Sequence, residues 1–289
     1  MLRSPPLRGC ALPVSALHRR VLPLCPRSSL LVTGAMAAAP ALQVDIQAVF
    51  DPMCPWCFFG LRRMQRALAA APHVSPRVTF VPYVFDKDTP VPPVPWRAYV
   101  QLRYPERAQN IVQVKLPLTR QVAASEGITL HEYENRPICP TVDALRLLLC
   151  ARETGRCASV ARGARCVLTC YELSALTCYL SRGSELQYVE ALLVEHFSKG
   201  RDTSDHSVLL ECATAAGVQA GTAEQALSSP ASLSWLWEED QRARRELHVT
   251  GVPHYVLSTH GAARAVHLSG AVESAAWTNA FADLSRQIA

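Results

Sequence analysis

Two cysteines three positions apart, Cys54 and Cys57, are the residues of this 289-residue sequence best suited to chemistry. The apolar stretch before them predicts a strand, and the apolar residues after them recur at helical spacing, so the pair lies at a strand-to-helix junction. The free backbone N–H groups and the dipole of a helix start stabilise a negative charge there. A thiol at this position loses its proton more easily, and only the thiolate attacks disulfides, so the position favours thiol–disulfide chemistry.

The same spacing has two other interpretations. The pair could be half of a zinc site, which needs two more ligands, or two ordinary buried cysteines. Pro55 suits the first helical turn, where no backbone donor is needed. Trp56 adds a flat side chain beside the thiols, which would either contact a partner or shield the helix end. Asp51, at the end of the strand, could assist proton transfer or simply cap a turn.

The basic excess of the sequence belongs to its first 44 residues. The formal net charge is +5, from 29 basic and 24 acidic residues, and residues 1–44 hold five arginines and no acid. The rest of the chain is neutral, so we expect no nucleic-acid partner. No apolar run approaches the ~20 residues of a membrane helix, so we expect no membrane partner either.

Residues 1–44 have the composition of an organellar transit peptide, with arginine, serine and proline but no acid. We expect this leader to be disordered or cleaved, in a protein of the mitochondrion or plastid. A secretory signal is one alternative, because Leu30–Pro40 is apolar and ends in small residues. Another is translation from Met36, which would make the leader dispensable and the protein cytoplasmic.

The remaining pattern predicts strand, CxxC helix, strand, a long helical segment, then two strands and a helix. The predicted strands after the CxxC helix are 77–85, 252–257 and 265–268, and the predicted helices are 118–127, 141–152 (ended by Gly155), 188–197, 205–216, one opening at the Thr222 capping box, 231–247 and 274–288. We therefore expect an α/β domain (45–88 and 249–289) interrupted by an inserted all-helical subdomain (89–248). His196, on an apolar helix face, is expected to be a core or edge residue.

The eleven cysteines do not resemble a secreted disulfide framework, because their number is odd and their distribution clustered. Residues 155–187 form an atypical cysteine-rich insertion without clean periodicity. A zinc site there is one interpretation, but the absence of a CxxC spacing favours a lineage insertion or an error in the gene model. Its cysteines are Cys157, Cys166, Cys170 and Cys178.

A second signature, Val252-Pro253, opens a predicted strand about two hundred residues after the thiols. A proline at the first residue of a central strand has no backbone N–H and cannot donate to the ladder. The bond before it is either an ordinary trans bond or a cis bond. A cis bond would let the edge of the strand present its backbone beside the thiols.

Together, these motifs resemble those of the DsbA-like thioredoxin-fold oxidoreductases. The similar segments are DPMCPWCFFG (51–60), VTGVPHY (249–255) and Ser269-Gly270-Ala271, while FSKGRDTSD (197–205) and Asn135 are similar to the FrnE-type branch. The resemblance covers about residues 45–154 and 188–289, and departs from the family at 155–187 and around Ile138-Cys139-Pro140. It implies a thioredoxin-like fold, with a central mixed sheet flanked by helices and a large helical insertion.

The resemblance also implies a thiol–disulfide oxidoreductase in which Cys54 attacks, Cys57 resolves and Pro253 follows a cis bond. The expected substrate-binding residues are Pro55, Trp56, Val252 and Pro253, with the backbone of Val252 offered to an extended substrate segment. We expect protein or small-thiol disulfides as substrates, glutathione disulfide among them, and neither a cofactor nor a metal.

Two alternative functions remain open. One is a kappa-class glutathione transferase or isomerase-like enzyme on the same fold, but such enzymes usually have serine at the first thiol position. The other is a non-enzymatic module that holds a metal or a client at the CxxC motif.

Overall fold

The computed structural model describes residues 41–161 and 184–288, and the side chains of 156–161 are not among its described features. The predictions made for residues 1–40 and for Cys166, Cys170 and Cys178 lie outside the described residues, and the side chain of Cys157 is likewise not described.

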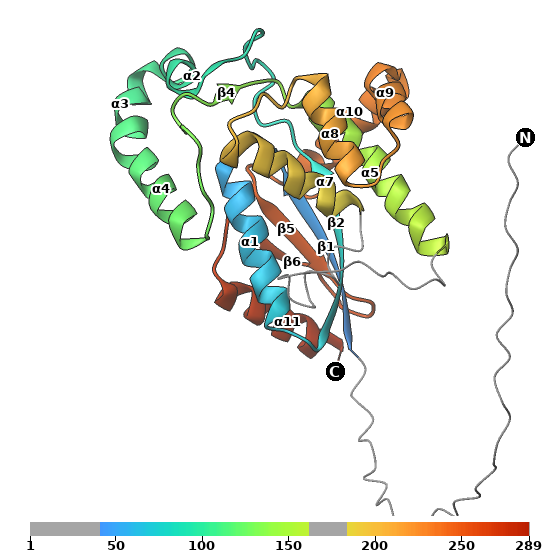
Figure 1. Ribbon diagram of the computed structural model, residues 1–289. Coiled ribbons are helices and arrows are strands. Elements are labelled where there is room, and N and C mark those ends of the chain that lie inside the picture. Colours follow the sequence, from blue (N-terminus) through green and yellow to red (C-terminus); the bar gives the residue numbers. More distant parts are fainter. Residues whose placement is uncertain (1–40, 162–183, 289) are drawn as a thin grey trace, which may run out of the picture. The chain divides into compact units, whose positions relative to one another are not determined.

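A four-stranded sheet of order β2–β1–β5–β6 lies at the centre of the described chain (Figure 1). Strand β1 (Leu42–Phe50) runs parallel to β2 (Val74–Pro82) and antiparallel to β5 (His254–Ser258). Strand β5 also pairs antiparallel with β6 (Val266–Ser269). The early and late parts of the chain therefore share one mixed sheet, and the predicted thioredoxin-like fold is confirmed.

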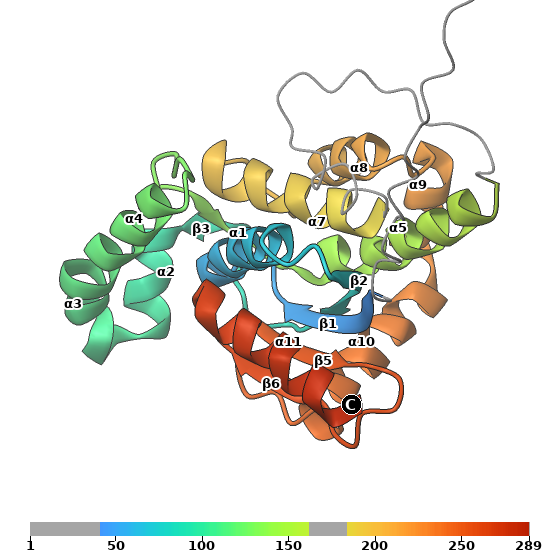
Figure 2. The ribbon, with the colours of Figure 1, turned by 90° about the horizontal axis from the view of Figure 1, so that it is seen from below.

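Different helices cover the two faces of the sheet. Side chains alternate between these faces along each strand, so neighbouring residues of one strand pack against different helices. Ile46 and Ala48 face the core that contains α1 (Pro55–Ala69) and α11 (Ser274–Ile288). These two helices lie side by side (Figure 2). Val49 points the other way and joins a smaller cluster with Ala243 of α10 (Pro230–Arg245).

The chain between β2 and β5 is helical, apart from one antiparallel pair of two-residue strands in the described residues, β3 (Val94–Pro95) and β4 (Pro137–Ile138). Its helices are α2 (Trp96–Arg103), the single turns Pro105–Arg107, α3 (Ala108–Asn110) and Ile111–Lys115, α4 (Leu116–Ser125), α5 (Val142–Ala161), α7 (Ser184–Leu193) with its π-helical extension Val194–Ser198, α8 (His206–Ala215) and α9 (Ala220–Ser228). Helices α2 to α4 lie together at the left of Figure 1. The division into domains 45–88 with 249–289 and 89–248 stays a proposal.

Two local predictions were wrong, and one helix was not predicted. Helix α5 continues through Gly155, because one glycine lowers helix propensity without ending a helix. Helix α2 was missed, since the proline-rich stretch before it hides a helix that begins at Trp96. Helix α9 begins at Ala220, ahead of the predicted capping box at Thr222.

The side chain of Arg63, on α1, is buried. Its Nε lies 2.7 Å from Oε1 of Glu126, the residue that ends α4, and its Nη1 lies 2.7 Å from the exposed Glu273. Arg66 binds the other oxygen of Glu126, with half of its side chain exposed. This cluster holds the CxxC helix to the inserted helices.

Replacing Glu126 tests how strongly that buried pair stabilises the fold. Glu126→Ala should lower the free energy of unfolding by about 3 kcal/mol, because it leaves the charge of Arg63 buried without its main partner. Arg66→Ala removes the exposed partner of the same carboxylate and should cost less than about 1 kcal/mol. Urea unfolding measures both, and equal losses would contradict this ranking.

Candidate active site

Cys54 is the last extended residue before α1, and Pro55 takes the first helical position. No side chain caps this helix start, and its first turn contains no acidic residue. The backbone N–H groups of Trp56 and Cys57 instead interact with the sulfur of Cys54. The sulfur therefore lies beside the free N–H groups of the helix start, where the helix dipole favours a negative charge.

The two thiols differ in their ease of ionisation. A hydrogen bond from the thiol of Cys57 is the largest cause that lowers the pKa of Cys54 below its ordinary value, and the two backbone groups add to it. Burial and the charge of Asp51 oppose this effect without cancelling it. Burial raises the pKa of Cys57 well above its ordinary value. At neutral pH, Cys54 is the better nucleophile, and Cys57 stays protonated.

The peptide bond between Val252 and Pro253 is cis, as the family resemblance implied. The sulfur of Cys54 lies 3.6 Å from the carbonyl oxygen of Val252, although 198 positions separate the two residues. Cys54 and Val252 are partly exposed, whereas Pro253 is buried. The two sequence signatures therefore meet at one accessible point.

Gly60 permits this close approach. A Cβ atom at this position would lie 2.3 Å from the hydroxyl oxygen of Tyr255 and 3.0 Å from Cγ of Pro253. The requirement for glycine inside a helix is thus one of space, since glycine otherwise weakens a helix. Gly60 positions the site, and sequence reasoning missed that role, although an isolated glycine in a helical pattern is the signal for it.

Asp51 is fully buried directly behind the thiols. Its carboxylate accepts hydrogen bonds from the backbone N–H groups of Met53 (2.7 Å) and Phe85 (2.9 Å) and from the hydroxyl of Thr141 (3.0 Å). Burial, the largest cause, raises its pKa to about 6 in spite of these bonds. Asp51 is thus both a turn residue and an acid that titrates near neutrality.

A groove of about 390 Å³ opens beside Cys54. Its walls come from the start of α1, from the Val252 loop and from the inserted helices α2 to α4. They carry six aromatic side chains, three cationic side chains and no carboxylate. The residues concerned are Trp56, Phe85, Trp96, Tyr99, Tyr104 and Tyr133, with Arg107, Lys115 and Arg136.

The family model of the DSBA-like thioredoxin domain matches residues 45–165 and 167–280. The chain belongs to this family. It is thereby an oxidoreductase that acts on thiol and disulfide groups. The FrnE-type branch within the family stays a prediction. No curated protein matches the sequence.

Solved structures agree with the family in fold. A "probable DsbA oxidoreductase" from Streptomyces coelicolor has 24% identity and a TM-score of 0.65, over 84% of this chain and 91% of that one. The cytosolic disulfide reductase DsbM from Pseudomonas aeruginosa has 17% identity and a TM-score of 0.51, over 84% of this chain and 98% of that one.

Other reactive side chains of this DSBA-like domain lie in different environments. Cys139 and Cys212 are buried free thiols, and burial raises the pKa of each to about 12. His196 is buried in the π-helical extension of α7, where burial lowers its pKa to about 3 and keeps it neutral.

No group of three or more metal-ligating side chains occurs within residues 41–161 and 184–288, as far as their side chains are described. In the same part of the chain, no helix is long and apolar enough to span a bilayer.

Removing the Cys57 thiol tests the cause of the pKa difference. In Cys57→Ala, the pKa of Cys54 should rise, because its sulfur loses its strongest stabilising hydrogen bond. The pH dependence of alkylation by iodoacetamide measures this. Cys57→Ser keeps a donor and should raise the pKa less. Cys212→Ala, which removes a thiol away from this site, should leave it unchanged. An equal effect of the Ala and Ser variants would contradict the assignment.

Proposed function

We propose that this domain exchanges disulfides through Cys54 and Cys57, opposite the cis-proline loop of Val252 and Pro253. The single observation that carries the proposal is the approach of the Cys54 sulfur to the carbonyl oxygen of Val252, at the uncapped start of α1. A substrate segment that pairs with the backbone of Val252 would bring its sulfur to Cys54. Pro55 and Trp56 would contact the same segment from the side of the helix.

The reaction has two exchange steps. The Cys54 thiolate attacks one sulfur of a substrate disulfide, so a bond from Cys54 to that sulfur forms while the substrate bond breaks and its other half leaves as a thiolate. Cys57 then loses its proton and attacks the sulfur of Cys54. The internal disulfide forms, the remaining substrate thiolate leaves, and two electrons have passed to the substrate. Oxidation of a dithiol substrate follows the same steps in reverse.

Asp51 would accept the proton of Cys57 in the second step. Its backbone and its charge both act on the Cys57 thiol, whose high pKa makes unassisted deprotonation slow. A base with a pKa of about 6 is ionised at pH 7 and can take the proton.

We propose protein disulfides and small-thiol disulfides, including glutathione disulfide, as substrates. The presence of cysteine at both positions 54 and 57 favours exchange over the kappa-class transferase alternative. Assay of the purified enzyme with glutathione and an electrophile would expose a transferase.

A trapping experiment tests the proposed exchange. Cys57→Ala should accumulate a mixed disulfide between Cys54 and its substrate, because the resolving thiol is missing. Non-reducing gels and mass spectrometry should detect adducts that dithiothreitol releases. Cys54→Ala is the matched control and should trap nothing. If Cys57→Ala forms no adduct and the wild type exchanges with no model disulfide, the proposed function is wrong.

The role of Asp51 predicts a pH dependence of the second step. Release from the mixed disulfide should slow as the pH falls below about 6, because Asp51 becomes protonated and can no longer accept a proton. Asp51→Asn should be about a hundredfold slower at pH 7, the low end of general-base effects, and should lose this dependence. Single-turnover quenching at several pH values measures both.

Thr141→Val is the matched variant, because it removes a hydrogen bond from Asp51 but keeps the charge. That bond lowers the pKa of Asp51, so its loss should move the pH dependence upward. An unchanged profile in both variants would exclude Asp51 as the base.

A further inference from the structure

Arg136 is a buried cation for which the described chain supplies no carboxylate. Its side chain is buried just before β4, its Nη1 donates to the carbonyl oxygen of Tyr133 (2.9 Å), and its Nε has no hydrogen-bond partner. The other buried arginines of the described residues, Arg63 and Arg146, each bind a carboxylate, at 2.7 Å in both cases. Burying a charge without a counter-ion is costly, so buried charges are normally paired, and Arg136 departs from that rule.

The guanidinium of Arg136 is held in place by aromatic rings. It lies 3.8 Å from the ring centroid of Tyr133, 5.2 Å from that of Phe197 and 5.7 Å from that of Trp96. These cation–π contacts compensate part of the lost hydration and fix the plane of the group. They supply no hydrogen-bond acceptor, so the hydrogen-bonding capacity of the buried Nε stays unmet.

Arg136 also lines the groove beside Cys54. Arg107 and Lys115 line the same groove, and no Asp or Glu does. A volume of about 390 Å³ suits a small ligand better than a folded partner. An anion that enters this groove would reach a preformed, partly desolvated cation next to the attacking thiol.

We propose that Arg136 binds a carboxylate of the disulfide substrate and thereby makes the enzyme selective for small carboxylate-bearing disulfides. This inference rests on the proposed exchange at Cys54. The carboxylate accepts from the guanidinium of Arg136, which lines the groove, and the substrate sulfur is then presented to Cys54. A planar guanidinium suits this contact better than an ammonium, because it offers two donors in a fixed geometry.

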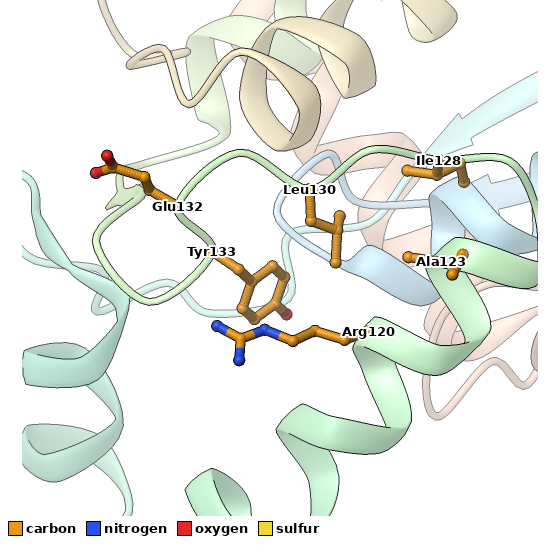
Figure 3. Close-up of a pocket in the computed structure, with 7 residues that line it drawn as sticks. Arg120, Ala123, Ile128, Leu130, Glu132 and Tyr133 are labelled. Carbon is orange, nitrogen blue, oxygen red and sulfur yellow. The ribbon is translucent and has the colours of Figure 1, made fainter.

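The neighbouring hollow in Figure 3 provides a matched control. It is lined by Arg120, Ala123, Ala124, Ile128, Leu130, Glu132 and Tyr133, and it shares Tyr133 with the groove. Arg120 extends toward the Tyr133 ring there, but Glu134 already binds it at 3.0 Å and half of its side chain is exposed. Arg120→Gln removes the same charge from the same region without altering the groove.

The experiment compares the reduction of two similar small disulfides, 3,3′-dithiodipropionate and neutral bis(2-hydroxyethyl) disulfide. Each rate with the reduced wild-type enzyme is divided by the rate of that disulfide with free 2-mercaptoethanol. The normalised rate should be higher for the dicarboxylate by about tenfold or more, the value of one hydrogen bond to a charged group. Arg136→Gln should slow the dicarboxylate far more than the neutral disulfide and so abolish this preference, Arg136→Lys should restore part of it, and Arg120→Gln should keep it.

Three outcomes would overturn the inference. Equal normalised rates for both disulfides with the wild-type enzyme exclude selectivity without any variant. Preservation of the preference in Arg136→Gln assigns it to another cation. If Arg136→Gln slows the reduction of both disulfides equally and raises the pKa of Cys54 in the alkylation assay, Arg136 stabilises the thiolate and does not select the substrate. Failure of the wild type to exchange with either disulfide would count against the proposed function itself, so the two failures are distinguishable.

Discussion

The close approach of α1 to the loop of Val252 and Pro253 is the constraint on which the rest of the site depends. The antiparallel pairing of β1 with β5 places the end of one strand beside the start of the other, so the two loops meet at one edge of the sheet. Gly60 then lets the helix lie against Tyr255, where a methyl group would collide with its hydroxyl. Without that space, the sulfur of Cys54 and the carbonyl oxygen of Val252 could not come together.

The helical insertion supplies charge control that a minimal thioredoxin-like sheet would lack. Thr141, just before α5, binds the carboxylate of Asp51 behind the thiols. Arg136 and the neighbouring rings of Trp96 and Tyr133 line the groove beside Cys54. The ion pair of Arg63 with Glu126 fixes this part of the insertion to α1. The inserted segment therefore contributes part of the groove lining, a hydrogen bond to Asp51 and an ion pair with α1, the helix that begins after Cys54.

Local signals were enough to predict the fold and the pair of thiols. The CxxC motif at a strand-to-helix junction, the late Val252-Pro253 signature and the helical periodicities placed the strands and helices along the chain, and the family resemblance implied the mixed sheet. The order of the strands within the sheet was not predicted. Long-range contacts were beyond reach, because burial of Asp51 and Arg63 depends on residues 34 to 90 positions away. Arg136 belongs to no sequence motif. That it lacks an ion pair among the described residues can be recognised only from the three-dimensional positions of the carboxylates. Helix α2 was hidden because prolines dominate the pattern before it.

The same electrostatics bear on the direction of the redox chemistry. Stabilising the Cys54 thiolate stabilises the reduced enzyme and makes its disulfide more oxidising. The charge of Asp51 acts against that thiolate, and with a pKa of about 6 this acid is ionised at neutral pH and neutral in acid. With Asp51 ionised, the Cys54–Cys57 dithiol is therefore a stronger reductant of substrates than it would be with a neutral residue at position 51. A single buried acid would thus assist the resolving step and, above pH 6, moderate the oxidising power that the helix start gives to Cys54.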